Sequence, residues 1–110
     1  MTGLPEPARG LLRALGARLG DDRALLHVAG WDAEPWCSAG LVGARVLLDL
    51  TFAGAGAEPA ADRLLDGLPD AELALPRGYV LDLAVDADRR ERGTAPRVEL
   101  ALSVLVVEED

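Results

Sequence analysis

The segment from Ala44 to Ala53 constrains the fold most, because apolar and polar side chains alternate along it. The apolar side chains that share one side of the extended chain are Val46, Leu48, Leu50 and Phe52. Arg45, Asp49 and Thr51 fall on the other side. A period of two residues is typical of a strand with one buried face. This segment therefore predicts a half-buried β-strand.

Two later segments alternate in the same way. In Tyr79–Asp86 the apolar side is formed by Tyr79, Leu81, Leu83 and Val85, and in Arg97–Val107 by Val98, Leu100, Leu102, Val104 and Val106. The charged stretch 87–96 between them contains Gly93 and predicts the loop of an antiparallel hairpin. Leu105 and Val107 fall on the polar side of the last strand. We expect the first helix or a partner protein to cover them.

Two segments show helical spacing instead. The first has apolar residues at Ala8, Leu11, Leu12, Leu15 and Leu19, and the second at Ala57, Ala61, Leu64, Leu65 and Leu68. Pro5 and Pro7 suit the start of the first helix, where amide donors are dispensable, and Gly20 suits its end. Pro59 suits the first turn of the second helix, and Gly67 its end.

The region between the first helix and the strand 44–53 has weaker signals. A short apolar stretch, 24–29, predicts a strand, whereas 30–43 predicts an irregular loop with one short strand near 36–39. A chain of 110 residues has the usual length of one domain. We therefore expect a single α+β domain over residues 1–110, with an antiparallel-rich sheet of about four strands and both helices on one face.

Charge and cysteine content exclude several classes of protein. The chain carries 19 Asp and Glu against 11 Arg and no Lys, a formal net charge of -8, which disfavours binding to nucleic acid or anionic membranes. A single cysteine, Cys37, excludes an intrachain disulfide and a cysteine-built zinc site. Residues 1–10 lack the order of a secretory signal, and no apolar run approaches the ~20 residues of a membrane span. We expect a cytoplasmic protein without cofactor or metal.

The turn before the second helix, Gly54-Ala-Gly56-Ala-Glu58-Pro59, resembles the start of a dinucleotide fingerprint. Pro59 stands where that motif needs its third glycine. Glu58 places a negative charge where a pyrophosphate would bind. The motif therefore indicates a tight turn, with Glu58 complementing the helix dipole.

Two groups of residues contain a possible nucleophile. His27, Asp32 and Cys37 supply the types of a thiol nucleophile, base and orienting acid, but their spacing does not support that role. Ser38-Ala-Gly40 lacks the upstream glycine of a nucleophile elbow.

The carboxylates of Asp86, Asp88 and Glu91 have the short spacing of cation ligands. Three arginines alternate with them and favour a self-paired, solvated loop instead: Arg89, Arg90 and Arg92. The same loop suits a contact arm that orders on a partner.

The two tryptophans are the sharpest interaction candidates. Trp31 and Trp36 flank Pro35 in a chain whose only other aromatic residues are Phe52 and Tyr79. Indole rings are favoured as interface anchors, and they also fill the ends of aliphatic cores. Both interpretations remain open at this point. The candidate interaction residues are Trp31, Trp36, Arg89, Arg90, Arg92, Leu105 and Val107.

The whole layout resembles the tail-terminator, or tail-completion, proteins of long-tailed phages and gene transfer agents. The residues that carry the resemblance are the N-terminal helix with Leu11, Leu12, Leu15 and Leu19, Trp36-Cys-Ser38 before Gly43-Ala-Arg45, Ala61-Asp-Arg63-Leu-Leu65, and Arg77-Gly-Tyr79-Val-Leu81. The resemblance implies a ring-forming, non-enzymatic part that joins a tail tube to a head connector, with sheet edges and the charged hairpin making ring contacts. It also implies an acidic inner surface that lets DNA pass. It implies no catalytic residue.

The sequence therefore favours a structural protein that self-associates or docks on a larger assembly. A second hypothesis is a small-ligand-binding or regulatory domain, with a cleft between the sheet and the loop 31–43. An enzyme that uses Cys37 or His27 is the third.

Overall fold

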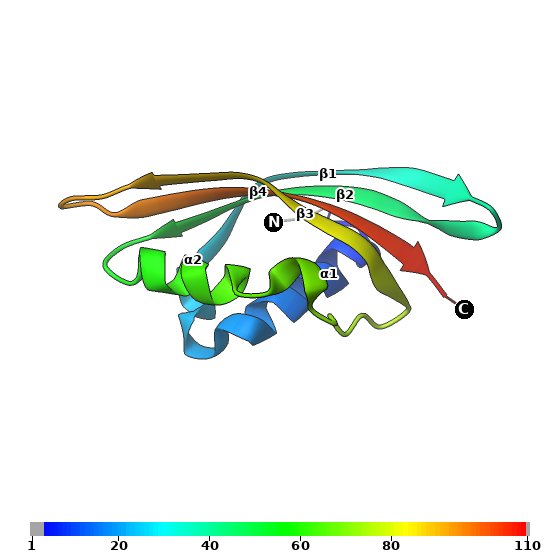
Figure 1. The fold of residues 1–110 in the computed structure, drawn as a ribbon, viewed down its shortest axis with the longest axis horizontal. Helices are drawn as coiled ribbons and strands as arrows, with labels where there is room; N and C mark the ends of the chain where they lie inside the picture. Colours follow the sequence, from blue (N-terminus) through cyan, green and yellow to red (C-terminus); the bar gives the residue numbers. More distant parts are fainter. Residues whose placement is uncertain (1–3, 110) are drawn as a thin grey trace.

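A computed structural model describes residues 4–109, which form a four-stranded antiparallel sheet with helices against one face (Figure 1). The elements in chain order are α1 (Glu6–Leu19), the 3₁₀ helix η1 (Gly20–Leu25), β1 (Leu26–Ser38), β2 (Leu41–Ala53), α2 (Ala57–Leu65), the 3₁₀ helix η2 (Leu68–Asp70), β3 (Gly78–Glu91) and β4 (Arg97–Glu108). The strand order is β1-β2-β4-β3, and every neighbouring pair is antiparallel. The predicted α+β class is confirmed.

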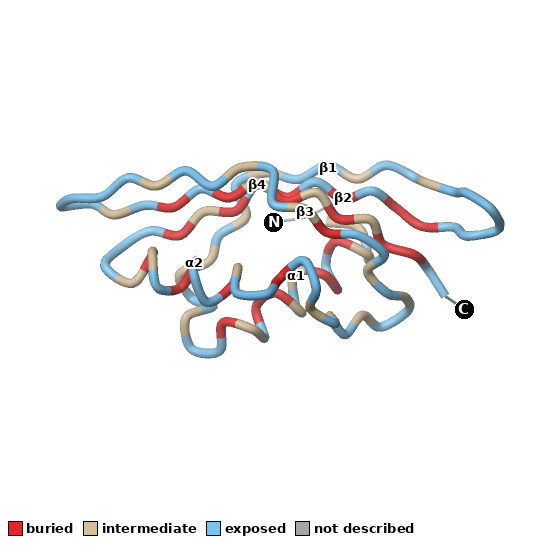
Figure 2. Tube along the Cα trace, viewed as in Figure 1, coloured by how far each residue is buried: buried red, intermediate tan, exposed pale blue. Residues whose placement is uncertain are grey.

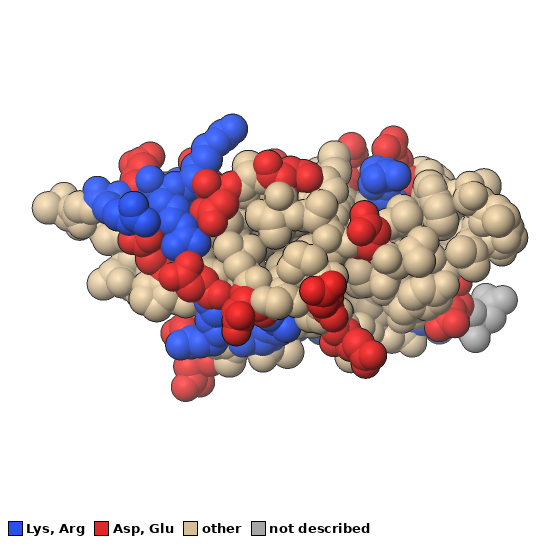
Figure 3. Space-filling model, viewed as in Figure 1, with Lys and Arg blue, Asp and Glu red and all other residues tan. Residues whose placement is uncertain are grey.

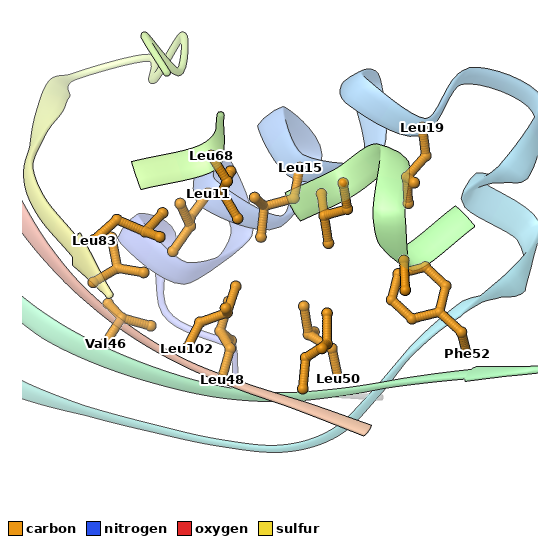
Figure 4. Close-up of a cluster of buried hydrophobic side chains, with 14 of the residues drawn as sticks. Leu11, Leu15, Leu19, Val46, Leu48, Leu50, Phe52, Leu68, Leu83 and Leu102 are labelled. Atoms are coloured by element: carbon orange, nitrogen blue, oxygen red, sulfur yellow. The ribbon is translucent and has the colours of Figure 1, made fainter. Parts of the chain in front are cut away.

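The core lies between the helices and the sheet face that they cover (Figures 2 and 4). Helix α1 contributes Leu11, Leu15 and Leu19, as its spacing predicts. The sheet contributes alternate residues of its two central strands: Val46, Leu48, Leu50 and Phe52 from β2, and Val98, Leu100, Leu102, Val104 and Val106 from β4. Both central strands thus bury one face, and full burial of each large aliphatic side chain contributes roughly 1.5–3 kcal/mol.

The region 24–43 differs from its prediction. Ala24 and Leu25 end the 3₁₀ helix η1, so the predicted strand at 24–29 begins only at Leu26. The predicted loop at 30–43 is instead most of a long hairpin, because β1 runs unbroken through Pro35 to Ser38. Strand β1 is an edge strand, and an edge is where a strand tolerates proline. The proline and glycine residues in this segment therefore led to the prediction of a loop where the chain forms a strand.

The second hairpin also differs. The predicted loop 87–96 is wrong over its first half, since β3 continues to Glu91 and only residues 92–96 connect it to β4. The pairing of β3 with β4 shifts between Val80 and Asp82 and again between Val85 and Ala87. Each bulge exchanges the faces of the strand. Of the four residues predicted to face inward on β3, only Leu83 is buried.

Helix α2 is shorter than its apolar pattern suggests. It ends at Leu65, and Gly67 adopts a left-handed conformation, with φ of 65°, before Leu68 starts η2. Arg18 of α1 donates hydrogen bonds to the carbonyl oxygens of Leu64, at 3.3 Å, and of Asp66. These carbonyls lie at the end of α2, where they lack helical partners. Arg18 thereby joins the two helices.

Candidate assembly surface

The two hairpins project from opposite ends of a molecule about 50 Å long (Figure 1). At one end the β3–β4 hairpin is tied to α2 by ion pairs. Arg90 lies 3.2 Å from Glu58 and 2.8 Å from Asp62, and Arg92 lies 2.9 Å from Glu58. Gly54 N–H also donates a hydrogen bond to Pro96 O at 3.1 Å. The charged residues predicted to form a contact arm are therefore mostly engaged within the chain.

The charges at this end stabilise one another. Hydrogen bonds from Arg92 and then Arg90 lower the pKa of Glu58 below its ordinary value. Hydrogen bonds to Asp88, Asp62 and Glu58 raise the pKa of Arg90. Glu58 lies in the first turn of α2, where its carboxylate also complements the helix dipole as predicted.

The tip of the β1–β2 hairpin is uncharged. No ionisable side chain except the thiol of Cys37 occurs between Glu34 and Arg45, and the tip exposes Leu41 and Val42, the latter by 57%. Figure 3 shows the contrast: arginines and carboxylates gather toward the β3–β4 end, and the projecting tip of the β1–β2 hairpin shows no charged atoms in this view. Leu41 and Val42 are not among the residues predicted from the sequence, although the uncharged run 35–44 was a visible signal.

The turn at this tip consists of Ala39 and Gly40, which have φ of 50° and 84°. Two successive positive φ values are the mark of a type I′ turn, whose first central position is favoured by Asn, Asp or Gly. Alanine is strained there, because its Cβ approaches the following carbonyl. The chain therefore holds an apolar residue at a position where a polar one is more stable.

Two glycines permit a close approach of strands at the base of this hairpin. A Cβ on Gly43 would lie 1.8 Å from Val106 O, and one on Gly78 would lie 2.1 Å from Val107 O. Both obstacles are backbone atoms of β4, which cannot swing away as a side chain does. The backbones of β2 and β3 thus approach the backbone of β4 closely, one from each side.

The sheet face away from the helices carries an aromatic row. The register aligns Trp36, Gly43, Val107 and Tyr79 across β1, β2, β4 and β3. Val107 is buried to 2% exposure although the helices lie on the other face, so the predicted cover by the first helix is wrong. Its neighbours in the row are Gly43, which has no side chain, and Tyr79, and Trp36 lies one strand beyond Gly43.

The two tryptophans do not form a joint anchor. Trp31 pairs with Leu48 and so shares the helix-covered side of the sheet, where it is 38% exposed. Trp36 pairs with Gly43 and shares the open side, where it is half-buried. Residues that pair across antiparallel strands point to the same face, so the two indoles lie on opposite faces.

Leu105 and Arg89 lie on the open face of the sheet. This face carries more carboxylates than arginines. Leu105, half-buried, stands between Arg45 and Asp82 in the register. Arg89 pairs with Glu99. The carboxylates that the register places on this face include Asp32, Glu34, Asp49, Asp82 and Glu99, against Arg45, Arg89 and Arg97. The open face therefore combines an apolar row with an acidic surround.

A hollow of about 590 Å³ lies near the base of the uncharged hairpin. Its apolar lining residues are Pro7, Leu75, Pro76 and Val106, and its charged lining residues are Glu6, Arg77, Glu108 and Glu109. It is formed by the start of α1, the segment before β3 and the end of β4. The cleft imagined beside the loop 31–43 does not exist in that form, because this segment is a β-hairpin.

The three residues considered as a thiol site, His27, Asp32 and Cys37, do not lie together. His27 and Cys37 belong to the same extended strand, and ten residues at about 3.3 Å each separate them by roughly 30 Å. Asp32 and Cys37 also pair with residues of opposite faces, Leu47 and Val42. This strand cannot bring the three side chains together.

Other chemical candidates are accounted for by the same geometry. Ser103 donates a hydrogen bond to Asp86, and Arg90 lies 3.0 Å from Asp88. Within residues 4–109 no group of three or more His, Cys, Asp or Glu side chains is arranged to hold a metal ion. None of the helices described is both long and apolar enough to cross a membrane.

Comparison with known proteins finds a likeness of structure only. No family model matches the chain, and no curated protein matches it. A solved structure described as "Virion of native gene transfer agent (GTA) particle" contains a chain of similar fold. The TM-score is 0.68 at 19% sequence identity, and the match covers 91% of this chain and 96% of that chain. At this identity the likeness shows that the two chains share a fold over nearly their whole lengths.

Proposed function

We propose that this protein is a structural, non-enzymatic component that self-associates within a phage-like particle, as a ring-forming part of the tail-terminator type. The observation that carries the proposal is the shared fold with a chain of a gene transfer agent virion, which extends over 91% and 96% of the two chains. Because nearly the whole length of each chain is matched, the likeness is not that of a small common motif.

The surface supports the same proposal. An open sheet face with an aromatic row and an exposed apolar hairpin tip are features typical of a chain that is covered in an assembly. The net charge of -8 suits a particle component that DNA passes without binding. Trp36 and Leu105 on the open face are the sequence-predicted residues that we place in protein contacts, whereas Val107 is already buried within its own chain. Trp31, at the sheet edge, is a further contact.

The test is the absolute mass in solution by size-exclusion chromatography with light scattering, repeated from micromolar to millimolar protein and followed by negative-stain electron microscopy. A discrete oligomer with ring-shaped images supports the proposal. A strict monomer throughout that range contradicts the ring-forming part of it.

A small-molecule site is the second candidate function, and the hollow at Leu75, Pro76 and Val106 is the observation that favours it. Its volume lies within the range of about 300–1,000 Å³ found for ligand pockets. A thermal-shift screen tests this candidate, because a ligand that binds only the folded state raises the melting temperature. Stabilisation that disappears in an Arg77→Glu variant would favour it.

A further inference from the structure

The open face of the sheet carries an apolar stripe along its two central strands, and the helices cover only the other face (Figure 1). Leu47 of β2 is 40% exposed on this face. Leu105 of β4 lies two residues beyond Ser103, the register partner of Leu47, and is therefore its diagonal neighbour. Tyr79 of β3, in the aromatic row, continues the stripe. Outward positions of central strands are ordinarily polar when one face is solvated, so an exposed leucine there indicates a face that another chain covers.

Carboxylates border this stripe on both sides. The register places Asp32 of β1 beside Leu47 and Asp82 of β3 beside Leu105. Glu34 lies two residues beyond Asp32 and points to the same face. All three carboxylates are exposed. Because β1 and β3 are the edge strands, the acidic side chains follow the two edges and the leucines lie between them.

The carboxylates of the open face differ from those of the helical side in their partners. On the helical side an arginine forms an ion pair with each of Glu6, Asp22, Glu58 and Asp62. Among residues 4–109, no ion pair involves Asp32, Glu34 or Asp82. Arg45 stands opposite Glu34 in the register without forming such a pair. The charge that borders the stripe is therefore not compensated within the chain, and it complements a cationic surface.

A second copy does not supply such a surface. Its open face has charge of the same sign. In the described part of the chain, every exposed large apolar side chain lies on a strand, so no helix of a second copy combines arginines with an apolar ridge. Arg9 and Arg13, on the outer side of α1, are also paired with Glu6. The tip of the β1–β2 hairpin brings exposed Leu41 and Val42 but no arginine.

The width of the face fits one helix. Neighbouring strands lie about 4.8 Å apart, so β1 and β3 are separated by roughly 14 Å. An α-helix with its side chains is about 10–12 Å across. A helix that lies along β2 and β4 contacts the leucines with one stripe and reaches the carboxylates of both edges from its flanks.

We propose that the open face binds a basic amphipathic helix of another component of the particle, with Lys or Arg on both sides of an apolar stripe. Leu47 and Leu105 bury that stripe, and Asp32, Glu34 and Asp82 pair with the cationic flanks. The inference rests on the proposed function for the existence of the particle, and it names a partner other than a second copy.

The probe is a synthetic helical peptide of about 18 residues, with leucines at i, i+3, i+4 and i+7 spacing and lysines on both flanks. A control peptide has glutamate at every lysine position. Binding is followed by the fluorescence of Trp36 in a Trp31→Phe variant, because Trp36 lies on the open face and Trp31 on the other. We expect a saturable spectral shift with the lysine peptide and none with the control. Absence of a shift with the lysine peptide would overturn the inference.

Two double variants separate the open face from the net charge of the chain. Asp32→Asn/Asp82→Asn removes two carboxylates beside the stripe, and Asp21→Asn/Asp66→Asn removes two exposed carboxylates on the helical side. Both variants change the net charge equally. We expect the first to raise the Kd of the lysine peptide about tenfold and the second to leave it within about twofold. Equal effects would indicate attraction to any acidic surface and would contradict the proposal.

Leu47→Thr tests the apolar stripe, because it shortens an exposed side chain and keeps a residue that suits strands. The Kd of the peptide should rise about fivefold, with the unfolding temperature nearly unchanged. An unchanged Kd would rule out the apolar contact. Light scattering on the same samples distinguishes this inference from the proposed function. Oligomers that bind no lysine peptide overturn the inference alone, whereas a monomer that binds it at the open face supports the inference and contradicts the ring.

Discussion

The β1–β2 and β3–β4 hairpins leave the same sheet at opposite ends, and they differ in the charge of the strands near their tips and in attachment (Figures 1 and 3). The β3–β4 hairpin is rich in Arg, Asp and Glu, and Glu58 and Asp62 of α2 hold it through Arg90 and Arg92. The β1–β2 hairpin has an uncharged tip that projects beyond the helices. Charged side chains at one end form ion pairs within the chain, whereas the apolar side chains Leu41 and Val42 at the other end are exposed.

A substitution at Phe52 tests how much the core contributes to stability at the end of the sheet that carries the charged hairpin. Its ring is fully buried at the end of β2, opposite Val98 of β4 (Figure 4). Phe52→Ala should lower the free energy of unfolding by about 3–5 kcal/mol, because it removes buried apolar surface and leaves a cavity. Urea unfolding followed by circular dichroism measures the loss. The exposed control Thr94→Ala should stay within about 0.5 kcal/mol of the wild type.

Gly43 tests the base of the apolar hairpin. Gly43→Ala places a Cβ against Val106 O, so the strands must separate, and we expect a loss of about 2–4 kcal/mol. Gly16→Ala is the matched control, because its added Cβ meets only the Arg23 side chain at 3.7 Å or more. That change removes a glycine from a helix interior and should raise stability by about 0.5–1 kcal/mol. Equal effects of the two substitutions would refute the close strand approach.

Glu58 tests the tether of the charged hairpin through pH. Its pKa is lowered in the folded state, so its contribution to stability is fully present above the ordinary pKa of glutamate. The contribution is lost as the pH falls from that value through the lowered pKa. Glu58→Gln, which cannot ionise, should lose less stability over this acid window than the wild type. Urea unfolding at neutral and acid pH compares the two, and parallel curves would contradict the tether.

Val42 gives the smallest expected effect on folding. Val42→Ala at the exposed tip should change the free energy of unfolding by less than about 0.5 kcal/mol, since few contacts within the chain are lost. A much larger loss, measured by the same urea unfolding, would mean that the apolar tip packs on its own chain. The two hairpins would then be attached alike, and the comparison would fail.

Much of the fold could be predicted because its strongest signals are local. Alternation in β2 and β4 and the leucine spacing in α1 describe segments that bury one face, and such a face needs only apolar residues at the right period. Most of strand β1 was not predicted, because Pro35 and several glycines are typical of loops. Strand β1 lies at the edge of the sheet, where such residues are tolerated. In β3, two bulges reversed the faces, and a bulge leaves no mark in the hydrophobic pattern.

The candidate surface was predictable only in part. Trp36, Leu105 and Val107 were identified from their residue types and positions, whereas the row that joins Trp36 and Val107 to Tyr79 requires the register of three strand pairs. The Arg-rich stretch was recognised as charged, but its main partner, Glu58, lies more than thirty residues away in the chain. Distant partners are set by how the elements pack.

The amino-acid pattern by itself determined the α+β class, the buried faces of the central strands and helices, and the acidic character of the chain, since each follows from neighbouring residues and composition. Tertiary structure alone decided which hairpin is tethered, which tryptophan faces which side, and where the hollow lies. Those features depend on register and on contacts between segments far apart in sequence, and a shift of one residue along a strand would move each of its side chains to the other face of the sheet.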